Sequence, residues 1–426
     1  MRVLVVGYGP GGVSAASAAR TFAPDAEVVV ITAESTPAHR RPGASLGLEF
    51  PYTRDLDIRD WSFEGLRKRR IEVWRESLVV DGDLDAKTVE VIHRGTKRTE
   101  RYDRLILAMG GTPVVPSIPG TDLEGVYTMQ NLSDASRAGR HLAGCKSVFI
   151  VGAGFSALEV AERLRSMKKK VHLMVRSRLM RRQLEPEMSE ELLSRLPDDI
   201  DVHMGREPTR INGSVRVESL EAGGETCPAE SVLLMTGVRP NTNLAKRLGL
   251  AIGGLGGISV NSRMETSHPD VYAVGDCVEM IDAVTGKPSL MPVGSVAARA
   301  GRQAGVLAVG GNRIYPDTSL RFQYDRLFGC DICCVGLSTD FASMMGMETR
   351  VQFLEDSSEY SKIALVTDSQ ERLVGGQVLS ARMGARLGFQ ILQRVEAHMV
   401  LAENPILRSR HEQMHALLER TLGPIR

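Results

Sequence analysis

The sequence predicts an α/β chain in which two parallel-sheet domains of the same type precede a third domain of the α+β type. Two observations predict the repeat. A short apolar run, a glycine turn and a helical segment occupy residues 3–20, and the same succession returns at residues 147–163. Each is followed by a second apolar run, which completes the βαβ unit of a Rossmann-like sheet. A third observation is the change after about residue 318 to short alternating segments. They predict strands at 320–324, 331–335, 349–353, 361–366 and 373–378, with helices after residues 383 and 406.

Length sets the number of domains. A chain of 426 residues exceeds the roughly 250 to 300 residues at which single cores stop growing. We expect a first domain from residues 1–112 and 246–315, a second from 113–245 and a third from 316–426.

Composition excludes some classes of partner. The chain has 42% hydrophobic and 25% charged residues and a formal net charge of +1, which gives no field for nucleic acid or a membrane surface. No apolar run has the length of a secretory signal or a membrane span. We therefore expect a cytoplasmic protein.

The first glycine turn has the spacing of a dinucleotide-binding fingerprint. Gly7 permits a tight turn, Gly9 lets the backbone approach a pyrophosphate, and Gly12 lets the helix pack closely on the strand. The phosphates would meet the N–H groups at the helix N-terminus. An acid is expected about 20 residues on to hold the ribose. Glu34 lies just past the second strand, although strict spacing falls on Thr32.

The second turn ends in alanine, a variant that the fingerprint allows, at Gly152, Gly154 and Ala157. The strand at 171–175 ends where an acid would hold the ribose of NADH, but Arg176, Ser177 and Arg178 stand there. Guanidinium groups grip a 2′-phosphate, which an acid would repel. This pattern favours NADPH over NADH, and a solvated basic edge is the alternative.

A distant segment indicates which dinucleotide the first unit binds. Residues 266–277 resemble the segment in which flavoprotein reductases place an aspartate on the ribityl chain of FAD, and Asp276 matches that aspartate. The helix that follows, at 292–305, resembles one aimed at the flavin. Its positive N-terminal end, near Gly294, would favour the negative charge of reduced flavin.

The two glycine turns and three further segments together resemble the motifs of the pyridine nucleotide-disulfide oxidoreductases. The three segments are at 108–113, 236–240 and 273–277. The branch of NAD(P)H oxidases and coenzyme A-disulfide reductases is the most similar. The resemblance covers nearly the whole chain and implies FAD, NAD(P)H and a homodimer formed by the C-terminal domain. Glu159 matches the active-site glutamate of that family. Phe155 matches an aromatic that covers the flavin, with core packing as the alternative.

The residues expected to bind the cofactors form two sets. On the FAD side they are Gly7, Gly9, Gly11, Gly12, Glu34, Arg41, Gly110, Gly275, Asp276 and Gly294. On the nicotinamide side they are Gly152, Gly154, Ala157, Arg176, Ser177 and Arg178. No metal site is predicted, since the six cysteines lack the spacing of a paired zinc site.

The family's disulfide chemistry does not carry over. An ungapped count puts Pro42 where relatives have a redox cysteine beside the flavin, and a shifted register puts Leu48 there. No cysteine occurs before Cys145. Disulfide exchange needs a thiolate nucleophile, so the catalytic position is predicted to hold Pro42 without thiol chemistry.

We therefore expect hydride transfer from NADPH to flavin N5 and then to an acceptor that no motif identifies: dioxygen, a quinone or dye, or a small iron–sulfur protein. One alternative is a disulfide, polysulfide or coenzyme A-disulfide reductase that uses Cys330, Cys333 and Cys334. Packing of these cysteines as small hydrophobes is the favoured interpretation, and three sulfurs are one short of a cluster's usual four ligands. Another alternative is a flavin-bearing electron-transfer subunit or redox sensor.

Overall fold

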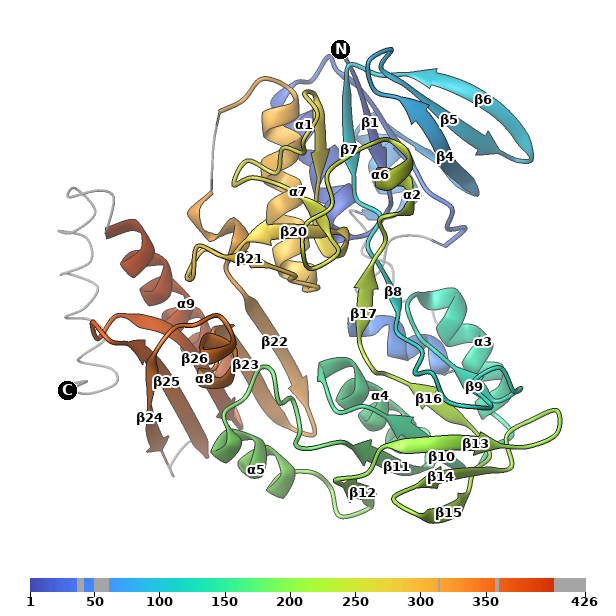
Figure 1. Ribbon diagram of the computed structural model, residues 1–426, viewed down its shortest axis with the longest axis vertical. Helices are drawn as coiled ribbons and strands as arrows, with labels where there is room; N and C mark the ends of the chain where they lie inside the picture. Colours follow the sequence, from blue (N-terminus) through green and yellow to red (C-terminus); the bar gives the residue numbers. More distant parts are fainter. Residues whose placement is uncertain (37–41, 50–60, 313–314, 357–359, 402–426) are drawn as a thin grey trace.

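The computed structural model describes residues 1–36, 42–49, 61–312, 315–356 and 360–401. Figure 1 shows three bodies: one contains the N-terminus and α7, one contains β10 and α4, and one contains the sheet from β22 to β26. The first two are built on parallel sheets and the third on an antiparallel sheet. The predicted fold class is confirmed.

The first body is a five-stranded parallel sheet in the order β19-β7-β1-β2-β3. Its strands are short runs of valine, leucine and isoleucine, as expected where both faces of a parallel sheet are covered. The strands are β1 (Arg2–Val6), β2 (Glu27–Ile31), β3 (Ile71–Trp74), β7 (Arg104–Leu107) and β19 (Val271–Ala273). The helices are α1 (Pro10–Phe22), α2 (Phe63–Lys68), α6 (Asn243–Arg247) and α7 (Gly294–Ala308).

Small sheets accompany this body. One is the antiparallel meander of β4 (Ser77–Asp83), β5 (Thr88–His93) and β6 (Thr96–Arg101). Another joins β18 (Ile258–Ser259), β20 (Val278–Ile281) and β21 (Pro288–Ser289). The two chain crossings to the second body pair as β8 (Gly111–Pro113) and β17 (Val238–Pro240).

The second body is a five-stranded parallel sheet in the order β12-β11-β10-β16-β9. One face packs against the helices through Val148, Ile150 and Leu173. The other face packs through Phe149 and Met174 against the meander β13 to β15. The strands are β9 (Val126–Tyr127), β10 (Ser147–Val151), β11 (Lys170–Val175), β12 (Ile200–Met204), β13 (Pro208–Asn212), β14 (Ser219–Ala222), β15 (Glu225–Pro228) and β16 (Val232–Leu234). The helices are α3 (Leu132–Leu142), α4 (Phe155–Ser166) and α5 (Pro186–Ser194).

The third body is an antiparallel sheet in the order β22-β23-β26-β25-β24, with α9 packed on it. All five strands expected from the alternating segments are present. The strands are β22 (Phe322–Leu327), β23 (Cys330–Gly336), β24 (Thr349–Asp356), β25 (Ser361–Asp368) and β26 (Leu373–Ser380). The helices are α8 (Thr339–Met344) and α9 (Gly384–Leu401). The helix expected after residue 406 lies outside the described residues.

Within the described part of the chain, no helix is both long enough and apolar enough to cross a membrane.

Candidate active site

The first fingerprint lies where β1 ends and α1 begins. Gly7 has φ +115°, and a Cβ there would lie 2.1 Å from the carbonyl oxygen of Ala108. A Cβ on Gly12 would lie 2.1 Å from the carbonyl oxygen of Gly7. The helix starts from an extended Gly9 with no side-chain cap. Its first N–H groups are therefore open to an anion, which fits the pyrophosphate of a dinucleotide.

Two further segments reach the same place. Asp276 lies in a short helical turn (Gly275–Cys277) directly after β19. Its neighbour Gly275 has φ +81°, and a Cβ there would lie 3.5 Å from the Cβ of Ala297 in α7. The start of α7 lies beside the start of α1, because a Cβ on Gly294 would be 3.9 Å from Cγ of Pro10. These residues fit one extended ligand such as FAD. Gly110, with φ +65°, follows the neighbouring strand β7.

Glu34 follows the end of β2 and is partly buried. Its N–H donates to Oγ1 of Thr32 at 3.1 Å. Thr32, which strict fingerprint spacing would select, is 4% exposed. The carboxylate of Glu34 is thus the more accessible acceptor for a ribose.

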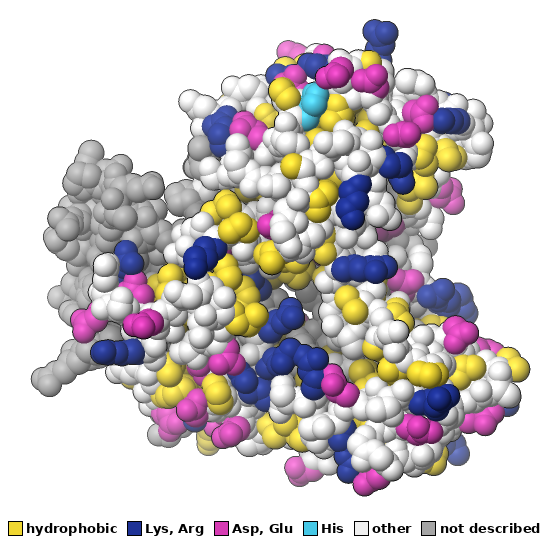
Figure 2. Space-filling model, in the orientation of Figure 1, with side chains coloured by type: hydrophobic (Ala, Val, Ile, Leu, Met, Phe, Trp, Pro, Cys, Tyr) yellow, Lys and Arg dark blue, Asp and Glu magenta, His cyan; other side chains and the backbone are white. Residues whose placement is uncertain are grey.

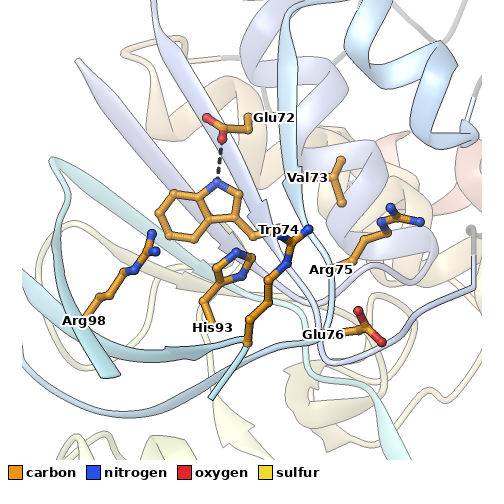
Figure 3. Close-up of a pocket in the computed structure, with 8 residues that line it drawn as sticks. Glu72, Val73, Trp74, Arg75, Glu76, His93 and Arg98 are labelled. Carbon is orange, nitrogen blue, oxygen red and sulfur yellow. Dashed lines mark hydrogen bonds between the residues drawn. The ribbon is translucent and has the colours of Figure 1, made fainter. Parts of the chain in front are cut away.

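A cavity of about 340 Å³ adjoins the Glu34 loop. The two are linked because the N–H of Glu76, which lines the cavity, donates to the carbonyl of Glu34 at 3.5 Å. Figure 3 shows the indole of Trp74 bonded to Glu72, with the ring of His93 beside it. The cavity therefore extends from the carboxyl end of the edge strand β3, on the ribose side of the fingerprint.

The second fingerprint repeats the geometry of the first. Gly152 has φ +126°, and a Cβ there would lie 2.3 Å from the carbonyl oxygen of Met235. Gly154 caps α4 in an extended conformation without a side-chain cap. Ala157 is 1% exposed, and Phe155, the first residue of α4, packs partly buried against the core of the second body.

A partly buried contact joins Glu159 of α4 to the short helix at residues 42–48. The hydroxyl of Ser45 donates to Oε1 of Glu159 at 2.7 Å, across 114 positions of sequence. Burial raises the pKa of Glu159 to about 8, the Ser45 bond lowers it in part, and Asp325 of β22 raises it. Glu159 therefore holds a proton at neutral pH. The sequence did not single out Ser45, since a lone serine carries no motif.

Ser45 belongs to a short helix (Pro42–Leu48) that packs on α3 and α4. Both positions at which a redox cysteine was considered, Pro42 and Leu48, lie in it, and Leu48 is fully buried. Arg41 lies outside the described residues, as does the side chain of Pro42.

The basic loop after β11 has two kinds of arginine. Arg176 is exposed and lies 3.2 Å from Glu207, and Ser177 is exposed. Arg178 is instead held, because its Nη2 donates to the carbonyls of Arg181 at 3.0 Å and Leu184 at 3.4 Å and to the carboxylate of Asp340.

The loop carries a concentrated positive charge. The pKa of Arg181 is lowered by desolvation and then by Arg176, Arg182 and Arg178. Figure 2 shows basic side chains gathered in this part of the molecule. Mutual repulsion of this kind is relieved when an anion binds.

This loop is fastened to the third body at several points. The carboxylate of Glu185, 2% exposed, accepts from Thr339 N–H at 2.8 Å and from the Gln377 amide at 3.2 Å. The hydroxyl of Ser338 donates to the carbonyl of Arg182 at 3.2 Å. Sequence reasoning missed these fastenings because they join residues more than 150 positions apart.

The profile of the pyridine nucleotide-disulphide oxidoreductases matches residues 1–304 of the chain. The chain belongs to that family. It is 31% identical over 421 residues to the NADH oxidase of Methanocaldococcus jannaschii, with 93% of this chain and 90% of that protein covered. Membership makes the chain an FAD-dependent NAD(P)H oxidoreductase.

Solved structures of family members agree with this assignment. An NAD-dependent persulfide reductase from A. fulgidus aligns with a TM-score of 0.86 and 27% identity, covering 93% of this chain and 77% of that one. An engineered water-forming NADPH oxidase, derived from a Lactobacillus brevis NADH oxidase, aligns with a TM-score of 0.83 and 25% identity. The alignment covers 93% of this chain and 91% of that one.

Proposed function

We propose that the chain oxidises NADPH at bound FAD and passes two electrons directly to dioxygen, without a protein disulfide. The observation that carries the proposal is the absence of a suitable thiol. The first cysteine of the sequence is Cys145, so the short helix that packs on Glu159 contains none. FAD supplies the hydride-accepting atom and a store of two electrons. The balanced reaction is NADPH, a proton and dioxygen giving NADP⁺ and hydrogen peroxide.

Hydrogen peroxide is the expected product because of the electron count. Forming water from dioxygen needs four electrons, and a flavin without a partner thiol holds two. Cys330, Cys333 and Cys334 do not supply the missing carrier. They are 4%, 0% and 3% exposed in β23, and burial raises the pKa of each, to about 12 for Cys333. Protonated thiols in a packed sheet are poor nucleophiles.

The choice of NADPH is supported by the engineered oxidase, whose structure holds that coenzyme. In that oxidase, alanine replaces a glycine at one position. Eighteen residues later, three consecutive residues are replaced: aspartate by alanine, alanine by arginine, and methionine by serine. Arginine replaces proline seven residues after that aspartate. The same spacing in this chain falls on Ala157, Val175, Arg176, Ser177 and Arg182. Four of these five are the residues introduced there, and Val175 likewise replaces the acid.

The geometry refines which arginines meet the 2′-phosphate. Arg176 and Arg182 are exposed, whereas the guanidinium of Arg178 is engaged with two carbonyls and Asp340. We assign Arg176 and Arg182 to the phosphate, and Arg178 to holding the loop in shape.

The test is anaerobic stopped-flow reduction of the flavin at limiting NADPH and NADH. We expect faster reduction by NADPH, and a ratio that narrows or inverts in Arg176→Glu, because a carboxylate repels the phosphate and suits a ribose diol. Arg216→Glu, an exposed arginine of the same body, is the control and keeps the parental ratio. Equal rates for the two coenzymes in the parent protein would remove the NADPH assignment.

The acceptor is tested by product analysis in air. One hydrogen peroxide per NADPH is expected. A peroxide yield well below that ratio, together with rapid turnover of a quinone or a small iron–sulfur protein, would show that dioxygen is not the acceptor. The quinone or the iron–sulfur protein would then take its place in the proposal. Rapid flavin reduction with negligible turnover of every small acceptor would favour an electron-transfer subunit or sensor.

A reductase of persulfides or disulfides is the second candidate, favoured by the similarity to the A. fulgidus persulfide reductase. Anaerobic dithionite titration separates the two. Our proposal expects bleaching after one two-electron equivalent per FAD, without a long-wavelength thiolate-to-flavin band. Two equivalents, with that band after the first, would make Cys330, Cys333 and Cys334 catalytic.

A further inference from the structure

We propose that the edge of the second sheet carries a binding site for a divalent transition-metal ion such as Zn²⁺, formed by His172, Asp201 and His203. His172 lies on β11, and the other two lie on the neighbouring edge strand β12. Among the described residues, this is the group of histidine, cysteine and carboxylate side chains whose ligand atoms all come within 4.8 Å of one another. It lies outside the fingerprint turns and the arginine loop.

The three ligand atoms form a nearly regular triangle. Nδ1 of His172 is 3.1 Å from Nε2 of His203 and 3.1 Å from Oδ2 of Asp201, and the third side is 3.6 Å. A circle through these atoms has a radius of about 1.9 Å, so a point just off their plane lies about 2.1 Å from all three, which is the zinc–ligand distance. The three atoms therefore have the spacing of ligands to a single ion.

The imidazoles are held in place before any ion binds. The ring of His172 stacks on Phe149, with centroids 4.3 Å apart and planes at 9°, and the ring of His203 stacks on His172 at 5.4 Å. Phe149 is 1% exposed, so the stack rests on the core of this body. Ligands fixed by packing lose little entropy on binding a metal.

The site is open to solvent on the side of its carboxylate. The side chain of Asp201 is 47% exposed, so an ion can enter from its side and keep a water or a small ligand in the open position.

The chemistry of the ligands selects the ion. Two imidazoles and one carboxylate suit Zn²⁺, Co²⁺ or Ni²⁺, whereas Mg²⁺ and Ca²⁺ prefer oxygen ligands. The site faces the meander β13 to β15 and not α4, because Met174, which shares the face of His172, packs into that meander. A bound ion would therefore clamp β11 to β12, away from Glu159.

Calorimetric titration of the chelator-treated, FAD-loaded protein with Zn²⁺ tests the proposal. We expect one Zn²⁺ per chain and no comparable binding of Mg²⁺. Asp201→Asn and His203→Asn should each weaken binding by about tenfold or more, as loss of a ligand does at least as much as loss of its supporting partners. Asp201→Asn changes an accessible side chain, so the fold should survive it.

The matched control is His268→Asn, since His268 also lies near a carboxylate, Asp85, at 3.4 Å, but outside the triangle. It should bind Zn²⁺ as the parent does. Zn²⁺ should also raise Tm by about 3 °C or more in the parent and the control but not in Asp201→Asn, because an ion that binds only the folded state stabilises it. Absence of stoichiometric binding, or binding that survives both ligand substitutions, would overturn the site.

Discussion

The two βαβ units share the geometry of their turns but differ in what covers their helices. Gly7 and Gly152 have similar positive φ angles, and a Cβ on either would lie 2.1 or 2.3 Å from the carbonyl oxygen of a neighbouring chain segment. Helix α1 is covered by α7, and a Cβ on Gly301 would lie only 2.1 Å from the carbonyl oxygen of Gly11. Helix α4 is held by side chains instead.

Those side chains reach segments outside the βαβ unit. Glu159 accepts from Ser45 of the short helix at residues 42–48, and Glu162 accepts from the N–H of Phe328 of the third body at 2.6 Å. The first helix thus has a close approach that only glycine satisfies, whereas the second adds polar contacts, which depend on charge and pH, to its apolar packing. Steric substitutions should damage the first unit, and changes of protonation should affect the second.

The largest expected effect comes from exchanging the third fingerprint residue in each unit. Gly12→Ala places a Cβ 2.1 Å from a backbone oxygen, so we expect destabilisation of about 3 kcal/mol or more and severe loss of bound FAD. Ala157→Gly removes a methyl group from α4 and should cost about 1 kcal/mol, with FAD retained. FAD content and denaturant unfolding measure both. Equal losses of stability and of bound FAD in the two variants would contradict the proposed difference between the two units.

The next effect is a pH dependence in the second unit. The folded pKa of Glu159, about 8, lies above its ordinary value of 4.5, so between these pH values the folded state keeps a proton that the unfolded state has lost. Stability should fall as pH rises through this window, by up to about 1.4 kcal/mol per pH unit. Glu159→Gln removes that dependence. The free energy of unfolding of this variant, relative to that of the parent, should therefore increase from pH 5 to pH 8.

Urea unfolding at pH 5, 6, 7 and 8 measures the slope, with Glu355→Gln, an exposed carboxyl, as the control that follows the parent. Parallel curves for the parent and Glu159→Gln would show that this carboxyl titrates without linkage to folding.

A smaller effect is expected at the loops that follow the second strands. The Glu34 loop is held locally by Thr32, whereas the arginine loop is tied to the third body through Arg178 and Asp340. Asp340→Asn should loosen that loop and raise the KM for NADPH about fivefold, equivalent to about 1 kcal/mol, with little change in kcat. Glu348→Gln, exposed in the same body, is the control. A lowered KM would mean that Arg178, once released, binds the phosphate itself.

The smallest effect is expected for the ion pair between Arg163 of α4 and Glu49, whose Nη1 and Oε1 atoms lie 2.5 Å apart. Their side chains are 28% and 41% exposed, and partly exposed pairs contribute less than about 1 kcal/mol. Glu49→Gln should therefore shift Tm by less than Ala157→Gly does. A larger shift would mean that this pair, and not packing, holds the short helix on α4.

Local patterns carried most of the fold. Both βαβ units, the five strands of the third body and the helix near residue 292 follow from periodicity and turn residues, and α7 begins at Gly294, two residues later than expected. The meanders β4 to β6 and β13 to β15 were not predicted, although β4, β5 and β14 alternate between buried and more exposed positions. The packed cysteines of β23 agree with the favoured interpretation of residues 330–334.

The site was harder to predict because its decisive contacts are distant in sequence. Ser45 meets Glu159 across 114 positions, and Arg178 meets Asp340 across 162. Spacing rules select residues within one βαβ unit and contain no information about which loop of another body will dock on it. The histidine and aspartate triangle escaped for the same reason, since β11 and β12 bring together residues about 30 positions apart.

The fastening of the arginine loop has a consequence for how coenzyme preference can change over time. The loop is shaped by Glu185 and Arg178 through contacts with Thr339, Asp340 and Gln377 of another body. A lineage that altered only the exposed arginines would keep a loop moulded for a phosphate, and one that altered the third body would disturb selectivity without touching the coenzyme. Preference should therefore respond to substitutions in two places: at the exposed arginines that would meet the phosphate, and at the residues of the third body that hold the loop in shape.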